Sequence, residues 1–168
     1  LTAADAAGVP LWTATPARKL IARQTDAGTQ VLGVEAEQHG KLLRIRARRG
    51  VVVATGGFER NPEMKRHFLR GPSPYTLGSE TNTGDGIRLG MALGADLRNM
   101  NEAWGITAYT GDAKENGARR AGISIYAQIE RRQPGGLCVN RHGERFGNEA
   151  ADYDSTWRTF HTFENWGE

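Results

Sequence analysis

The sequence predicts a mixed α/β (α+β) fold in which an antiparallel β-meander leads into a buried strand and then into helices. Three observations support this expectation. Short β-rich segments follow one another with only short turns between them, which is typical of a meander. An apolar run without polar alternation then ends at two glycines. Helix-start signals come directly after those glycines.

The N-terminal residues predict the end of a helix followed by the meander. Residues 1–8 have the composition of the last helical turns before a C′ glycine. Residues 9–15 form a short β-rich segment. Strands are expected over residues 17–22, 30–36 and 42–47, with turn signals at 26–28 and 39–41. Because the chain opens inside a helical pattern without a signal peptide, we expect it to be a piece of a longer protein.

The segment Val51–Phe58 reads VVVATGGF and predicts a central strand, buried on both faces over residues 51–54. Asn61 as N-cap and Pro62 at the first helical position predict a helix that runs to about Leu69. A second helix is expected from about Gly84 to residues 94–95. Its glycines lie four residues apart, which indicates close packing along one face; they are Gly86, Gly90 and Gly94.

Composition excludes several classes of function. The net charge is only +3, and the basic run Arg44–Arg49 alternates with apolar residues without aromatic ones, so we expect a solvated strand face and no nucleic-acid binding. The single cysteine, Cys138, excludes an internal disulfide and favours a reducing, cytoplasmic location. The histidines lack metal-ligand spacing, so no metal is expected. No apolar run approaches the ~20 residues of a membrane span.

The end of the predicted strand is a candidate ligand site. Thr55, Gly56 and Gly57 would place a hydroxyl and backbone N–H groups at the carboxyl edge of a sheet, where open α/β sheets bind ligands. Glycines there let a phosphate or a flat ring approach the backbone. A purely structural turn is the alternative interpretation.

Several segments together resemble one family. In order they are Val51–Phe58, Thr83–Ile87, Leu93–Ala95, Leu137–Asn140 and Gly143–Glu149. The series is similar to the flavoproteins of the fumarate reductase and succinate dehydrogenase family, nearest to its 3-ketosteroid Δ1-dehydrogenase members, over about residues 1–155. The resemblance implies FAD as cofactor and a small-molecule substrate. It also implies part of a Rossmann-like FAD-binding domain over residues 1–100 and part of an α+β capping domain over 101–168.

The resemblance also implies which residues contact the cofactor. The backbone of Ala17 would contact the adenine ring, and Asp85 would lie near the flavin; an N-cap role is the alternative for Asp85. The strand end would pass close to FAD through Ala54, Thr55, Gly56 and Gly57. The family's G-x-G-x-x-G fingerprint and its C-terminal flavin-closing segment are absent from the sequence. We therefore expect the 168 residues alone to bind FAD weakly or not at all.

The substrate side departs from the fumarate reductases. Their proton-delivering arginine corresponds to Tyr153 here, and their Glu-x-x-Arg relay falls on Ile129 and Arg132, with Glu130 adjacent. A phenol cannot hold a carboxylate bidentately as a guanidinium does, so a dicarboxylate substrate is disfavoured. The resemblance instead implies hydride transfer between flavin and a carbonyl-activated C–C bond, with Tyr153 and Arg132 as candidate catalytic residues.

Alternatives remain open at this point. Tyr153 could simply pack within the cap. The segment Arg145–Glu149 could anchor the cap or contact the ligand. A reductase of small unsaturated acids, with Arg132 or the pair Arg119 and Arg120 as carboxylate clamp, is the second function. The third is a non-catalytic fragment that binds a ligand or a partner.

Overall fold

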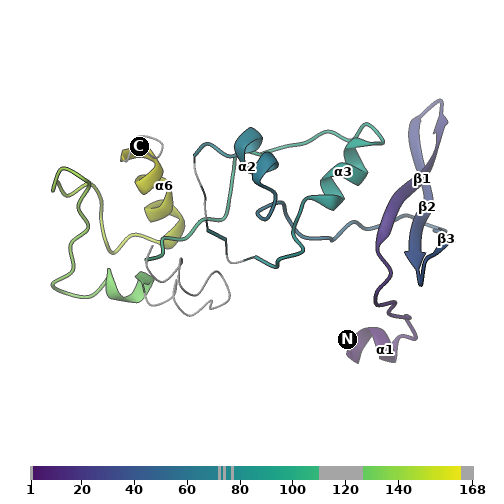
Figure 1. The fold of residues 1–168 in the computed structure, drawn as a ribbon, viewed down its shortest axis with the longest axis horizontal. Coiled ribbons are helices and arrows are strands. Elements are labelled where there is room, and N and C mark those ends of the chain that lie inside the picture. Colours follow the sequence, from purple (N-terminus) through teal and green to yellow (C-terminus); the bar gives the residue numbers. More distant parts are fainter. Residues whose placement is uncertain (1, 72, 74, 77, 110–126, 164–168) are drawn as a thin grey trace. The chain divides into compact units, whose positions relative to one another are not determined.

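The computed structural model describes residues 2–71, 73, 75–76, 78–109 and 127–163 (Figure 1). The chain forms two compact units. The first comprises Leu1–Thr55 and Asp85–Leu97, and the second comprises Gly56–Gly84 and Arg98–Glu168. The chain therefore leaves the first unit immediately after Thr55 and returns to it at Asp85. Arg119 and Arg120 lie outside the described residues.

The first unit begins with the short helix α1, Thr2–Ala6. Gly8 adopts a positive φ of 66° and its N–H donates to Asp5 O at 3.0 Å, which ends the helix as the sequence predicted. Residues 9–15 contain no strand, contrary to expectation. Pro10 and Pro16 bound this segment and have no N–H to donate to a ladder, which gives a physical reason for the difference.

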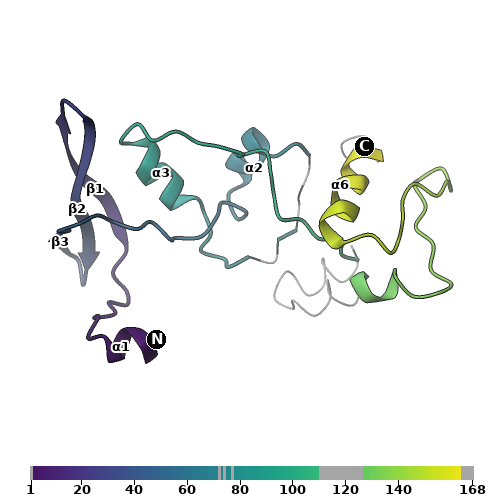
Figure 2. The ribbon, with the colours of Figure 1, turned by 180° about the vertical axis from the view of Figure 1, so that it is seen from behind.

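The predicted meander is confirmed as an antiparallel sheet in the order β1-β2-β3 (Figures 1 and 2). Its strands are β1, Ala17–Thr25, β2, Gly28–Gln38, and β3, Lys41–Arg46. His39 and Gly40 both have positive φ, as a two-residue hairpin turn with the right twist requires. At Gly33 a Cβ atom would overlap the carbonyl of Ile45, so the close approach of β2 and β3 requires glycine there.

The expected central strand over residues 51–54 is wrong for the described chain. These residues have no strand pairing, and Val52 is 91% exposed. An extended segment becomes a strand only when a neighbour takes up its backbone hydrogen bonds, and none of the described residues does so. The apolar composition therefore indicated an extended backbone over residues 51–54, but it could not show whether another strand pairs with it.

The helix α3, Asp85–Met91, packs against this segment within the first unit. A Cβ atom at Gly86 would lie 2.5 Å from Thr55 Oγ1 and 2.7 Å from Val53 Cγ1. The predicted close packing therefore holds at Gly86. Gly94 lies beyond the end of the helix, with φ of 81° and no atom near its Cβ position, so the expected glycine face is shorter than predicted.

The second unit starts with α2, Pro62–Phe68, whose predicted N-cap is confirmed. Asn61 Oδ1 accepts from Met64 N at 3.0 Å, and Asn61 Nδ2 donates to Thr83 O at 3.0 Å. Residues 127–130 are helical, and the unit ends in α6, Tyr153–Phe163. Among the residues that the structure describes, every helix is too short or too polar to cross a membrane.

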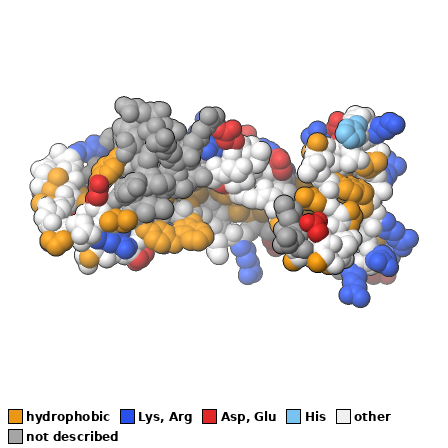
Figure 3. All heavy atoms as spheres, turned by 90° about the horizontal axis from the view of Figure 1, so that it is seen from below, with side chains coloured by type: hydrophobic (Ala, Val, Ile, Leu, Met, Phe, Trp, Pro, Cys, Tyr) orange, Lys and Arg blue, Asp and Glu red, His pale blue; other side chains and the backbone are white. Residues whose placement is uncertain are grey.

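Few hydrophobic side chains are buried. In the described part of the chain they are Leu20, Ala36 and Ala127. Figure 3 shows hydrophobic side chains at the surface instead. The most exposed large ones are Val52 at 91% and Trp104 at 85%. Exposed apolar area on this scale is typical of surfaces that other protein covers.

Candidate functional site

The segment of residues 51–57, where the sequence predicts a strand end, presents unused backbone donors. Gly56 has φ of 80°, and a Cβ atom there would overlap the amide of Asn82. Asn82 is itself held by Glu59, whose Oε1 accepts from Asn82 Nδ2 at 2.5 Å. The N–H groups of residues 51–57 donate to no acceptor within the described chain. An exposed backbone of this kind can bind a ligand rich in acceptor oxygens, such as a phosphate or a ring carbonyl.

The predicted cofactor-binding residues are divided between the two units. Gly56 and Gly57 belong to the second unit; Ala17, Ala54, Thr55 and Asp85 belong to the first. Asp85 is the first residue of α3, which makes Gly84 the capping residue, and its carboxylate pairs with Arg88 Nη1 at 3.0 Å. Thr55 lies against Gly86, the residue next to Asp85. Ala17 begins β1 opposite Ala36. The cofactor roles of these residues remain predictions.

Tyr153 is the first residue of α6, whose N-terminus is capped by Asp152. Asp152 Oδ1 accepts from Ser155 N at 3.0 Å, and the hydrogen bonds from Ser155 hold the pKa of Asp152 below its ordinary value. The half-buried phenol of Tyr153 accepts a hydrogen bond from Trp104 Nε1 at 2.5 Å. The two rings also stack, with centroids 6.3 Å apart and planes 25° apart. No local sequence pattern indicates this pairing, because it joins residues 49 positions apart.

Arg132, the second candidate catalytic residue, is exposed on the same unit. Its Nη2 donates to Ala151 O at 3.2 Å, two residues before Tyr153. Ile129, at the predicted relay position, is 50% exposed, and the neighbouring Glu130 accepts from the hydroxyl of Tyr109 at 2.7 Å. Among the described residues Arg132 has no carboxylate partner, so they contain no Glu–Arg relay there.

The buried guanidinium of the next residue, Arg131, holds the turn before α6 in place. Its nitrogen atoms donate to Gln128 Oε1 at 2.9 and 2.7 Å, to Ala151 O at 2.8 Å and to Glu149 O. Burial, and then the charge of Arg132, lower the pKa of Arg131 from its ordinary value. Sequence reasoning missed this residue, because nothing in the run Glu130-Arg131-Arg132 distinguishes the buried arginine from the exposed one.

The segment Arg145–Glu149 makes contacts that favour an anchoring role. Glu149 is buried, and its carboxylate accepts from Arg145 Nη2 at 2.6 Å and from Cys138 N at 3.0 Å. These hydrogen bonds, that of Arg145 first, lower the pKa of Glu149 from 4.5 to about 2. Asn148 Oδ1 accepts from Ala150 N at 3.0 Å. The polar groups of this segment are thus used to shape the chain that leads to Tyr153.

Because the pKa of Glu149 is lowered in the folded chain, we expect the folded chain to lose stability in acid. Because its pKa is lower in the folded chain than its ordinary 4.5, the stabilisation is fully present above pH 4.5 and is lost as pH falls toward 2. The wild-type melting temperature, followed by circular dichroism, should fall across this window. A Glu149→Gln variant should melt lower at pH 7 and change less between pH 4.5 and 2, whereas Glu63→Gln on exposed α2 should retain the wild-type dependence. Equal slopes for Glu149→Gln and wild type would contradict this assignment.

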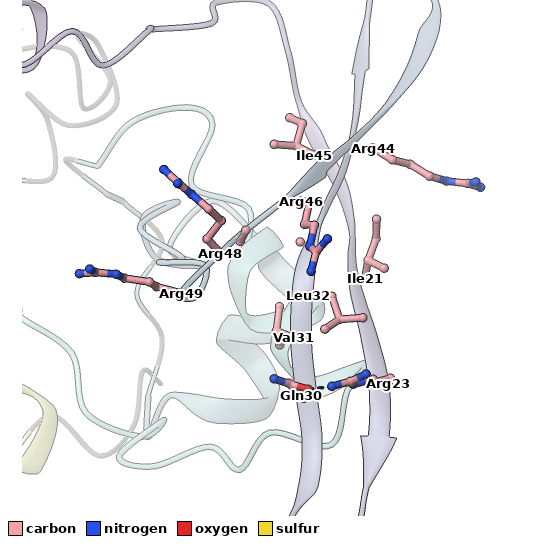
Figure 4. A pocket seen from close by; sticks show the side chains of 12 residues that line it. Ile21, Arg23, Gln30, Val31, Leu32, Arg44, Ile45, Arg46, Arg48 and Arg49 are labelled. Carbon is pink, nitrogen blue, oxygen red and sulfur yellow. Dashed lines mark hydrogen bonds between the residues drawn. The ribbon is translucent and has the colours of Figure 1, made fainter.

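A groove of about 450 Å³ on the meander is a second place where a ligand could bind (Figure 4). Its arginines do not converge on one point: Figure 4 shows Arg44 directed away from Arg48 and Arg49. Arg44 pairs with Glu35 at 3.1 Å, and Ile45 is half-buried while Arg44 and Arg46 are exposed. This alternation confirms the predicted solvated strand face over Arg44–Arg46, whereas Arg48 and Arg49 lie beyond the end of β3.

Comparisons with known proteins give consistent matches. A family model described as "FAD binding domain" matches residues 1–165. A 3-oxosteroid 1-dehydrogenase of Mycobacterium tuberculosis is 42% identical over 122 residues, which are 71% of this chain and 20% of that protein. A 4-oxocyclohexanecarboxylate 2-dehydrogenase of Sinomonas cyclohexanicum is 35% identical over 123 residues, which are 73% of this chain and 21% of that protein.

A solved structure gives a similar match. The 3-ketosteroid Δ1-dehydrogenase of Sterolibacterium denitrificans, in complex with 1,4-androstadiene-3,17-dione, has a TM-score of 0.80 and 34% identity. The match covers 95% of this chain and 28% of that one. This chain therefore spans between about a fifth and little more than a quarter of the length of these relatives.

Proposed function

The chain belongs to the FAD binding domain family, as the order of its motifs predicted, and we propose that it supplies part of an enzyme that dehydrogenates a C–C bond next to a ring ketone. The observation that carries the proposal is the phenol of Tyr153, presented at the start of α6 with an N–H donor on its oxygen. The names of the relatives from Mycobacterium and Sinomonas support the substrate class, because both are dehydrogenases of cyclic ketones.

The residues at the strand end fit FAD chemically. Ala54, Thr55, Gly56 and Gly57 offer backbone N–H groups that no described residue uses, and FAD carries pyrophosphate and ring-carbonyl acceptors. Ala17 and Asp85 would hold the adenine and flavin sides, as the resemblance implies. When bound, FAD supplies the oxidation by taking up a hydride.

The task left to this chain is to bind the ketone and to move one proton. The C–H bond beside the carbonyl is acidified by that carbonyl, and in the direction of dehydrogenation the phenolate oxygen of Tyr153 takes up its proton and becomes the phenol. The phenol then passes this proton to solvent before the next turnover. In the reverse direction the phenol O–H returns a proton to the same carbon. Exposed apolar side chains such as Trp104 suit a hydrophobic substrate. A cytoplasmic location, favoured by the single cysteine, is part of the same proposal.

We further propose that flanking polypeptide completes the site, since the relatives are several times longer and Val52 is exposed beside the strand end. This longer protein is called the complete enzyme below. In an FAD titration, the 168-residue chain alone should give no saturable change in flavin absorbance, whereas the complete enzyme should retain flavin after purification. Tight stoichiometric FAD on the chain alone would contradict this proposal.

The reaction itself is tested by dye reduction with the complete enzyme. A 3-oxosteroid or 4-oxocyclohexanecarboxylate should reduce the dye, and the product should contain a new double bond beside the ketone. Fumarate and acrylate should not be reduced when the enzyme is supplied with reduced dye. Reduction of these acids without ketone oxidation would favour a reductase of unsaturated acids, and no turnover with either class would favour the non-catalytic alternative.

A further inference from the structure

Trp104 is tied to Tyr153 by two separate contacts, a hydrogen bond from its N–H at 2.5 Å and the stacking of the two rings. We propose that Trp104 is a positioning residue, which fixes the direction in which the oxygen of Tyr153 exchanges its proton. The inference rests on the proposed function, because it gives Trp104 a role only through Tyr153.

The backbone on both sides of Trp104 is fixed on α6. Glu102 accepts from Arg158 Nη1 at 2.6 Å and from Arg70 Nη2 at 3.3 Å. On the other side, a Cβ atom at Gly105 would overlap the indole of Trp157, so the chain lies directly on that ring. Since Tyr153, Trp157 and Arg158 all belong to α6, residues 102–105 run along this helix. The backbone that carries Trp104 is therefore held against α6, and its indole reaches Tyr153 through the hydrogen bond and the ring contact.

The donor-only character of an indole decides what this contact does. A Trp N–H cannot accept a hydrogen bond, so the hydroxyl proton of Tyr153 must point to an acceptor other than Trp104. In the phenolate form, the N–H occupies one of the lone-pair positions on the oxygen. The proton that the phenolate takes up must therefore arrive at another position on the oxygen. The same N–H continues to donate when the oxygen carries charge, and such hydrogen bonds are stronger than neutral ones.

Trp104→Phe in the complete enzyme tests this role, because it keeps an aromatic ring beside Tyr153 and removes the N–H together with the five-membered part of the indole. We expect kcat to fall about tenfold, with KM for the cyclic ketone changed less than about threefold. Binding of the dehydrogenated product, measured from the flavin absorbance without turnover, should change by less than about threefold. Trp12→Phe is the matched control, because Trp12 is a 49% exposed tryptophan of the first unit, and it should retain the wild-type kcat.

The double variant separates positioning from general packing. In a Tyr153→Phe background, Trp104→Phe should cause no further loss of kcat, because the atom that it positions is already absent. The inference about Trp104 alone would be overturned if Trp104→Phe lowered kcat by the same factor in the wild-type and Tyr153→Phe backgrounds. It would also be overturned if Trp104→Phe kept the wild-type kcat while Tyr153→Phe was slow. A wild-type rate for Tyr153→Phe would overturn both the inference and the proton-exchange role on which it rests.

Discussion

Replacement of Tyr153 by phenylalanine in the complete enzyme is expected to lower kcat by about 10²–10⁴-fold, the range typical of a lost acid–base group. Phenylalanine keeps the ring that stacks on Trp104 and the first helical position of α6. It removes only the oxygen that accepts the Trp104 N–H at 2.5 Å and that, in our proposal, exchanges the substrate proton. The measurement is steady-state dye reduction with a cyclic ketone at saturating concentration.

Flavin content and KM identify the step that is lost. Both should stay near wild type in Tyr153→Phe, because in our proposal the removed oxygen exchanges the substrate proton, whereas the backbone around residues 51–57 holds FAD. Tyr109→Phe is the matched control: it removes a hydroxyl from the same unit, one that donates to Glu130 at 2.7 Å, and should leave kcat within about twofold. If Tyr153→Phe turned over as fast as Tyr109→Phe, the packing interpretation of Tyr153 would replace the catalytic one.

The predictable parts of the fold are those that depend on local chemistry. The helix end at Gly8, the N-cap at Asn61 and the turn at Gly40 each require a particular residue at one position, and each was predicted correctly. Local chemistry could not decide whether residues 51–54 form a strand. Its apolar residues favour a buried strand, but pairing depends on a neighbour that no local pattern specifies.

The candidate site shows the same division. Tyr153 is a candidate because the family resemblance implies a catalytic group four residues after Glu149, and its role remains a prediction. Its partner Trp104 was not a candidate, because the pairing depends on how residues 102–105 lie along α6. Burial of Arg131 rather than Arg132 likewise depends on carbonyl groups contributed by residues 149 and 151. Contacts between distant segments therefore decide the parts of the site that sequence reasoning could not reach.

Arg131→Ala is expected to lower the free energy of unfolding by about 3–5 kcal/mol. Arg131 is only 8% exposed, and it satisfies Gln128 Oε1 and the carbonyl groups of Glu149 and Ala151. Alanine would remove the guanidinium donor from Gln128 Oε1 and Glu149 O in a place that water reaches poorly, and would leave Ala151 O with only the hydrogen bond from Arg132. Gln128 also donates to Thr107 Oγ1 at 2.6 Å, so the loss would spread to a third segment.

Urea unfolding followed by circular dichroism measures the effect, and Arg132→Ala is its control. Arg132 is the next residue along the chain but is exposed, and its side chain makes one hydrogen bond to a described residue, to Ala151 O at 3.2 Å, so its loss should cost less than about 1 kcal/mol. Arg131→Lys should recover little, because one ammonium cannot reproduce the forked contacts of a guanidinium. A cost for Arg131→Ala no larger than that for Arg132→Ala would show that the buried guanidinium does not hold the turn before Tyr153.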